Sequence, residues 1–240
     1  MFWGSEPPRP FVLFGPAHLS ALALVAGIVA AVWIFRRRLR AWRGEKMLRA
    51  AIAALILIQS AVYQAWLITN RTWTLRTSLP FSICECAAFL CACMLLAKSK
   101  RAFDVAFFIG TLISALVILT PALDFTFPHV RFIEFFMEHG LIVISPLYML
   151  SVHGFRPTQK AIWKTMLFLN LGAPFVALLN HVTGGNYWFI ANVPEQTTLL
   201  SILGPWPWYI LTAQLLGVAV FYLSLLPFWI VRRVRAGRTL

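Results

Sequence analysis

Seven long runs of apolar residues constrain the fold of this chain more than any other feature. Each run approaches the ~20 residues that a helix needs to cross the hydrocarbon core of a bilayer. A helix is the form that such runs take in lipid, because it satisfies its backbone hydrogen bonds internally. The sequence therefore predicts an all-α, polytopic membrane protein with seven transmembrane helices in a single membrane domain over residues 1–240. The runs cover about residues 17–35, 48–69, 79–97, 103–120, 133–151, 162–180 and 208–231.

The positions of the basic residues predict the orientation of these helices. Cytoplasmic segments of membrane proteins carry an excess of Lys and Arg. With the N-terminus outside, only four of the 21 Lys and Arg residues lie on the outer side, namely Arg9, Arg71, Arg76 and Arg131. We therefore expect an outer N-terminus, a cytoplasmic C-terminus and a location in the cell inner (plasma) membrane.

The formal net charge of +13 has the same explanation. Because the basic residues flank apolar runs, we expect them to contact anionic lipid headgroups and do not expect the chain to bind nucleic acid. Membrane lipids are thus the partners that the sequence predicts. It indicates no soluble partner, no cofactor and no metal ion, and it leaves the oligomeric state open.

Ionisable residues inside the predicted spans gather toward the outer side. Glu85 lies about two turns into the third run, while Glu134, Glu138 and His139 lie in the first two turns of the fifth. Ionisable residues within a bilayer usually face the bundle interior and mark a functional site. Glu134 and Glu138 share one helix face, whereas His139 points about 100° away. The pattern predicts an outward-opening polar pocket among the third, fifth and sixth spans.

Other polar residues on the same side are candidates for binding a substrate in this pocket. Asn180 and His181 end the sixth run, His18 begins the first, and Arg131 directly precedes the fifth. Glu134 belongs with them, but it fits equally well as a helix N-terminal carboxylate favoured by the helix dipole. His18 and His181 also fit as ordinary interfacial histidines. The sequence leaves these alternatives open.

The four cysteines all fall in the stretch "CECAAFLCAC" of the third run. Cys84 and Cys91 share one helix face, and Cys86 and Cys93 share another, each pair about 10 Å apart along the axis. Such a separation excludes a disulfide within the span, and no metal-binding spacing is present. Three of them fit as small packing residues. Cys84 is outermost and adjoins Glu85, which makes it a candidate nucleophile.

Four stretches, taken in order, carry a resemblance to a known family: "LPFSICECAAFL", "TPALDFTFPHVRFIEFFMEHGLIVISPLYML", "GGNYWFI" and "LGPWPWY". Over about residues 11 to 231 they resemble the YwaF-like bacterial integral membrane proteins. That family is distantly similar to eukaryotic multi-span proteins that handle lipid acyl groups, a phospholipid acyltransferase and the androgen-induced hydrolases of fatty-acid esters. Those enzymes use a membrane-embedded Cys or Thr nucleophile with a histidine.

The resemblance implies that His139, in "MEHGLIV", is the catalytic histidine. It leaves the nucleophile between Cys84 and Ser82. The bacterial pattern has a His where this chain has Ser82, followed two residues later by the Cys that corresponds to Cys84. The acyltransferase's own Cys falls closer to the preceding Pro, near Phe81.

Two functions therefore follow as hypotheses. The first is a lipid-directed acyltransferase or hydrolase with His139 as general base and Cys84 or Ser82 as nucleophile. In it, Glu85 or Glu138 orients the imidazole. The second is a non-enzymatic binding or transport protein whose acidic and histidine side chains carry a proton or hold a cationic solute. An acidic pocket that contains a histidine suits both.

Overall fold

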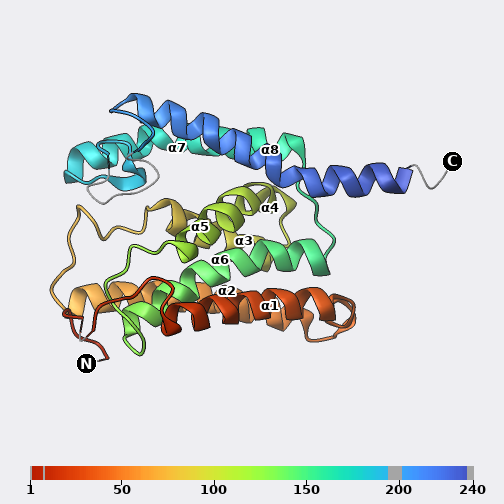
Figure 1. Cartoon of the computed structure of the whole chain (residues 1–240), viewed down its shortest axis with the longest axis horizontal. Helices are drawn as coiled ribbons and strands as arrows, with labels where there is room; N and C mark the ends of the chain where they lie inside the picture. The colour runs from red at the N-terminus through yellow and green to blue at the C-terminus, as the bar shows by residue number, and fades with distance from the viewer. Residues whose placement is uncertain (1, 8, 194–201, 237–240) are drawn as a thin grey trace. The chain divides into compact units, whose positions relative to one another are not determined.

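The computed structural model of the chain describes residues 2–7, 9–193 and 202–236. It divides into two compact units, Met1–Arg156 and Pro157–Leu240, which are described separately. Apart from one isolated β-bridge between Pro10 and Phe125, the regular structure in these residues is helical (Figure 1). The predicted all-α class is confirmed.

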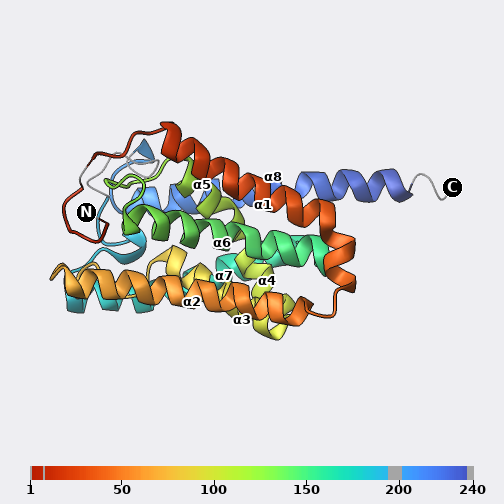
Figure 2. The same cartoon turned by 90° about the horizontal axis from the view of Figure 1, so that it is seen from below.

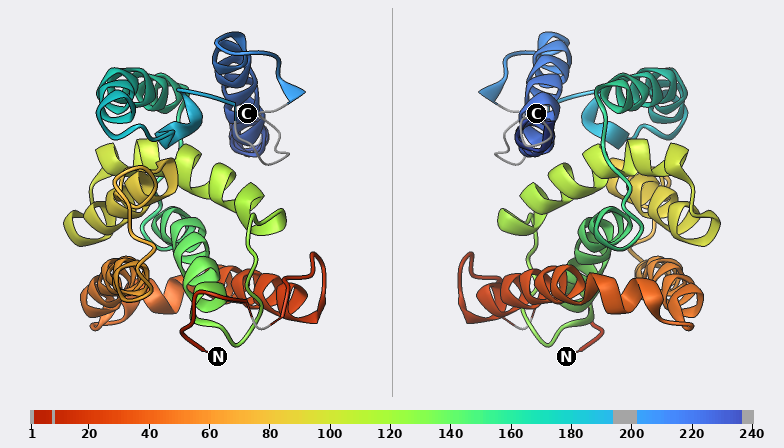
Figure 3. Two further views of the ribbon diagram at one scale, coloured as in Figure 1. Left: turned by 90° about the vertical axis from the view of Figure 1, so that its left-hand side faces the viewer. Right: turned by 90° about the vertical axis from the view of Figure 1, so that its right-hand side faces the viewer.

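The first unit is a bundle organised around one central helix. Its elements are α1 (Pro16–Ala41), α2 (Glu45–Thr69), α3 (Ile83–Ala97), α4 (Lys100–Ala106), the π-helix η1 (Phe107–Ile113), α5 (Ser114–Leu119) and α6 (Val130–Val152). α6 packs against α1, α2, α3, η1 and α5, as Figures 2 and 3 show. Its most apolar window is 72% buried, against 11% for α1, whose apolar side chains mostly face outward as they would in lipid.

The described residues of the second unit form two long helices and a short helical turn that follows the first of them. α7 (Gln159–Thr183) packs against α8 (Trp208–Ala236), and the short 3-10 helix η2 (Tyr187–Phe189) lies in the segment between them. Only 11% of the most apolar window of α8 is buried, so this helix also presents an apolar surface outward.

Among the described residues, six helical segments are long and apolar enough to cross a membrane, and a multi-pass membrane protein is thereby confirmed. The third run differs from its prediction, because α3 begins at Ile83 and has 15 residues. Ser82 forms the N-cap of α3, which fixes the start of the helix after the Leu79-Pro80 pair. Which side of the membrane each terminus occupies stays a prediction.

A glycine allows the π-helix to approach the central helix closely. A Cβ atom added at Gly110 of η1 would lie 3.0 Å from Cγ2 and 3.2 Å from the carbonyl oxygen of Ile142 in α6. Larger side chains would force the two elements apart. Single turns of π-helix occur often at functional sites, and this one adjoins the polar residues described next.

Candidate functional site

Three carboxylates approach one another inside the first unit, and we call them the carboxylate cluster: Glu85 on α3, and Glu134 and Glu138 on α6. They interact electrostatically with one another. Glu85 and Glu134 are buried, and Glu138 is half-buried. The structure thus brings together the acidic residues that the sequence placed in two different spans.

One basic side chain accompanies these carboxylates. Arg131 forms an ion pair with Glu134, and its guanidinium lies 4.0 Å from the ring centroid of Tyr63 and 5.1 Å from that of Trp66. The two aromatic faces and the carboxylate hold the guanidinium in place. A single arginine offsets only part of the negative charge that three ionised carboxylates would carry.

Glu85 also has a structural role that the sequence analysis did not assign to it. The Ser82 Oγ accepts a hydrogen bond from the Glu85 N–H (3.1 Å), and the Glu85 carboxylate accepts one from the Ser82 N–H (2.9 Å). This reciprocal pair is a capping box, which satisfies two backbone donors at the start of α3. Glu85 therefore lies in the first turn of its helix, one turn shallower than expected.

Glu138 faces a polar residue that sequence reasoning passed over. Gln59 of α2 is fully buried beside Glu138. Among the described residues, neither amide atom of Gln59 completes a hydrogen bond of normal geometry, and the same holds for the hydroxyls of Thr111 and Ser114. Buried polar groups almost always have partners. A glutamine in the middle of an apolar run was the signal that could have revealed this position.

His139 is buried and directly follows Glu138 in the same turn of α6. Its Nδ1 lies 2.8 Å from the carbonyl oxygen of Phe135 and 3.9 Å from the Glu138 Oε2. A carbonyl only accepts hydrogen bonds, so Nδ1 carries the proton and Nε2 has its lone pair available. No residue in the described ranges hydrogen-bonds this Nε2. The imidazole is thus fixed in the tautomer that a general base at Nε2 requires.

The two candidate nucleophiles, Cys84 and Ser82, are not hydrogen-bonded to this histidine in the described residues. Cys84 forms no disulfide with a described cysteine, and its thiol lies beside the Ser114 hydroxyl. Its charged neighbours are Glu85 and Glu138. The basic groups that interact with Cys84 in the described residues are therefore carboxylates, and its pairing with His139 stays a prediction.

His18 uses both ring nitrogens to join elements of the first unit. Its Nδ1 accepts a hydrogen bond from the Phe14 N–H (2.9 Å), so Nε2 is the protonated nitrogen and donates to the Ile118 carbonyl (2.8 Å). The side chain is fully buried and connects the start of α1 to α5. These contacts leave it no free nitrogen for a substrate.

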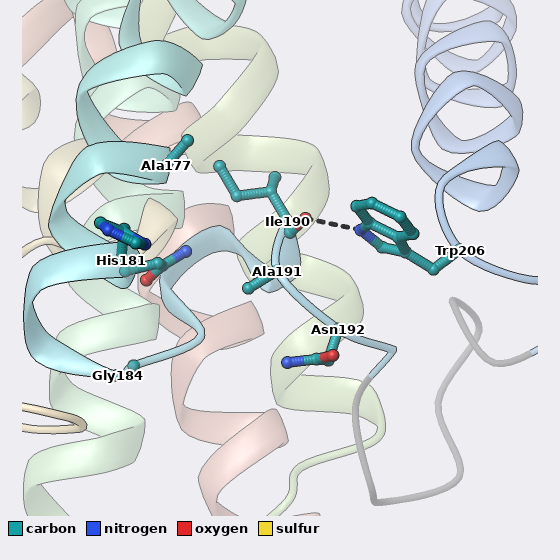
Figure 4. Close-up of a pocket in the computed structure, with 9 residues that line it drawn as sticks. Ala177, His181, Gly184, Ile190, Ala191, Asn192 and Trp206 are labelled. Carbon is teal, nitrogen blue, oxygen red and sulfur yellow. Dashed lines mark hydrogen bonds between the residues drawn. The ribbon is translucent and has the colours of Figure 1, made fainter.

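Asn180 and His181 belong to the second unit. Asn180 is buried, and its side chain accepts from the Tyr187 N–H (2.7 Å) and donates to the Tyr187 carbonyl (3.0 Å), which fixes the connection to η2. His181 is exposed and lines a pocket with a volume of about 450 Å³ (Figure 4). Whether the two residues share a pocket with the carboxylate cluster stays a prediction.

A second buried polar group lies at the other end of α6, about 28 Å from Glu134 by helical rise. We call it the Glu45 network. One carboxylate oxygen of Glu45 accepts hydrogen bonds from the Arg49 Nε (2.8 Å), the Tyr148 hydroxyl (3.0 Å) and the His153 Nε2 (2.6 Å). Arg49 also donates to the carbonyl of Leu95. The network therefore ties α2 to α3 and α6.

Burial and hydrogen bonding shift the pKa of His153 in this network in opposite directions. Burial lowers the pKa of His153 below its usual range, and the hydrogen bond to Glu45 raises it by a smaller amount. The neutral imidazole is accordingly favoured in the folded protein. Sequence reasoning missed the network, although the spacing of Glu45 and Arg49 by four residues was visible.

Comparison with known proteins gives one match. A model of the TMEM164 family matches residues 13–225, a range that includes the carboxylate cluster, His139 and the Glu45 network. No curated protein and no solved structure matches the chain. The resemblances to YwaF-like proteins and to lipid acyl enzymes stay predictions.

Proposed function

This chain belongs to the TMEM164 family, and we propose that it acts on membrane lipids by acyl transfer or ester hydrolysis, with His139 as the general base. The observation that carries the proposal is the tautomer of His139. Its Nδ1–H donates a hydrogen bond to the Phe135 carbonyl, so Nε2 is the nitrogen that can accept a proton. The surrounding helices are those of a multi-pass membrane protein, so membrane lipids are the molecules that surround the site.

In the proposed reaction, Nε2 of His139 takes the proton of a hydroxyl group on water or on an acceptor lipid. The oxygen of that hydroxyl attacks the ester carbonyl carbon, and the tetrahedral intermediate then expels the alcohol of the donor lipid. The imidazolium returns its proton to the departing oxygen, so charge and protons balance. The products are a fatty acid or a new ester together with a lysolipid.

Glu138 has a positioning role in this reaction. Its Oε2 lies 3.9 Å from the His139 Nδ1, close enough to stabilise the transient imidazolium. Direct attack by the acceptor hydroxyl suits the site better than a covalent intermediate on Cys84, since the charged neighbours of that thiol are Glu85 and Glu138.

A lipid-exchange assay tests this proposal. The purified chain is placed in vesicles with isotope-labelled diacyl phospholipid and a lysolipid acceptor, and products are measured by mass spectrometry. A general base contributes about 10²- to 10⁴-fold to rate, so we expect His139→Ala to lose at least about 100-fold in turnover. Cys84→Ala should keep most of the activity, as should the matched variant Cys93→Ala, whose side chain is exposed on the same helix.

Two results would contradict the proposal. Loss of turnover in Cys84→Ala but not in Cys93→Ala would replace direct attack with a covalent mechanism. Wild-type protein that leaves labelled phospholipid unchanged, with either water or lysolipid as acceptor, would remove the enzymatic hypothesis altogether.

The carboxylate cluster supports a second candidate function, binding of a proton or a cationic solute. Arg131 pairs with only one of the three carboxylates, Glu134, and the buried amide of Gln59 lies against Glu138. Acidic groups in this setting in a membrane often carry ions or protons. Proton uptake into vesicles that contain the protein, followed with a pH-sensitive dye, should fall in Glu138→Gln and stay unchanged in Glu6→Gln, which lies outside the helices.

A further inference from the structure

The second unit holds a pocket that the proposed chemistry does not use. It lies where α7 ends, between the last turns of that helix and the segment that follows η2 (Figure 4). Its volume of about 450 Å³ falls within the range of small-molecule sites. The described residues that line it all belong to the second unit.

The pocket has an apolar wall and a polar wall. Ala177, Ile190 and Ala191 provide apolar surface, while the side chains of His181 and Asn192 provide hydrogen-bond donors. Both of these polar side chains are exposed, and no other described residue hydrogen-bonds their side-chain polar atoms. None of the described lining residues is acidic. Such a lining fits a ligand that carries acceptor oxygens next to an apolar chain, and it does not fit a cation.

The loop wall of the pocket is held in place by hydrogen bonds. The Asn186 Oδ1 accepts from the N–H groups of Ala191 and Asn192, each at 3.1 Å. The Trp206 indole N–H donates to the Ile190 carbonyl, also at 3.1 Å, as the dashed line in Figure 4 marks. The Asn192 side chain is therefore presented from a fixed backbone, which lowers the entropy lost on binding.

The same segment contains two residues in a costly backbone conformation. Trp188 and Phe189 have φ angles of 58° and 54°. For aromatic residues this left-handed region costs on the order of 1–3 kcal/mol, and it persists where the surroundings enforce it, often at binding sites. Gly172 of α7 makes room for the Trp188 indole, because a Cβ there would lie 2.5 Å from the ring.

Tryptophans indicate the depth of the pocket in the bilayer. Trp206 lines the pocket, Trp208 begins α8, and both side chains are exposed. Exposed tryptophans in membrane proteins concentrate at the interface between headgroups and hydrocarbon. At that depth, the lipid groups nearest to the pocket are the ester carbonyls of the glycerol backbone.

We propose that this pocket binds an ester-linked glycerolipid. The ester carbonyls accept hydrogen bonds from His181 and Asn192. The first methylenes of the acyl chain lie along Ala177, Ile190 and Ala191. This inference is independent of the proposed chemistry at His139, because it concerns binding in the second unit and requires no turnover.

Native mass spectrometry of the full chain in an ester-free detergent tests the inference. The protein carries His139→Ala, so no ligand is consumed and the binding result stands apart from the catalytic one. It is titrated with a diacyl phosphatidylcholine, with its diether analogue and with glycerophosphocholine. The diester should bind most tightly, the diether about fivefold more weakly for each hydrogen bond lost, and the headgroup alone should not bind.

Pocket variants localise the binding. Asn192→Ala should weaken diester binding about fivefold while leaving diether binding nearly unchanged, because the ether lacks the carbonyl acceptor. Ala177→Trp fills the pocket and should weaken binding of both lipids by at least tenfold. The matched control is Val182→Trp on the same helix, at a side chain that is 74% exposed and outside the pocket.

Three outcomes would overturn the inference. Equal affinities for diester and diether would exclude the ester carbonyls as the recognised group. Competition by glycerophosphocholine would indicate a headgroup site. Equal effects of Ala177→Trp and Val182→Trp would show that lipid bound in the titration lies elsewhere on the protein.

Discussion

Replacing Glu45 with alanine removes the carboxylate oxygen at the centre of the Glu45 network. Arg49 is only 5% exposed, so its guanidinium would stay buried without a counter-ion. Breaking a buried ion pair by removing one partner costs about 3–5 kcal/mol. We therefore expect the free energy of unfolding to fall by that amount in Glu45→Ala. Tyr148→Phe removes a single hydrogen bond to the same oxygen and should cost about 1.5–3 kcal/mol.

Reversible unfolding in mixed micelles, driven by a denaturing detergent and followed by circular dichroism, measures these losses. Lys46→Ala is the matched control, since this side chain is exposed beside Glu45 and should change stability by no more than about 0.5 kcal/mol. The double variant Glu45→Gln with Arg49→Met removes both charges and should be more stable than Glu45→Ala. A loss below about 1 kcal/mol in Glu45→Ala would refute the reasoning, as would a double variant whose loss equals the sum of its two single losses.

Further predictions concern acid stability, the cap of α3 and a buried amide. Because burial lowers the pKa of His153, its contribution to stability is present above the unfolded pKa of about 6.5 and is lost as the pH falls; the melting temperature should drop between pH 7.5 and 5.5, and less so in His153→Gln. Ser82→Ala should cost about 1 kcal/mol in unfolding free energy and Ser82→Thr much less, with lipid turnover unchanged in both; abolished turnover would instead make Ser82 a nucleophile. Gln59→Leu should raise the unfolding free energy by about 1 kcal/mol or more in the same titration, because it removes buried amide atoms that make no hydrogen bond of normal geometry, and a decrease would show that the amide stabilises the neighbouring Glu138.

Much of the helical framework was predictable from the length of the apolar runs. The fifth run, predicted at 133–151, matches α6 at Val130–Val152 within three residues, and the others agree similarly except at the start of the third and at the ends of the first and seventh, where α1 (to Ala41) and α8 (to Ala236) continue past the predicted residues 35 and 231. The start of α3 could also have been predicted, since "SICE" contains the Ser-x-x-Glu pattern of a capping box. Both signals are local, because hydrophobic length and caps depend on residues close in the chain.

The candidate site was predicted less completely. Glu134 and Glu138 were expected to share a helix face, which follows from their spacing alone, and Arg131 lies one turn before them. The tautomer of His139, with the lone pair on Nε2, is likewise determined by a local contact, the hydrogen bond to the carbonyl of Phe135 four residues earlier. The neighbour of Glu138, however, is Gln59 on another helix, and no spacing in the sequence connects the two.

The sequence by itself determined that this chain forms membrane-spanning helices and which residues occupy each one, because burial in lipid requires only a sufficient apolar length. Tertiary structure alone decided which polar side chains meet. Glu45 and His153 are 108 positions apart and become partners only through the rotation and offset of α2 against α6. The rotation and the offset of these helices depend on how all the neighbouring side chains pack together. The surrounding lipid does not determine the rotation, because it is equally apolar on every side of a helix.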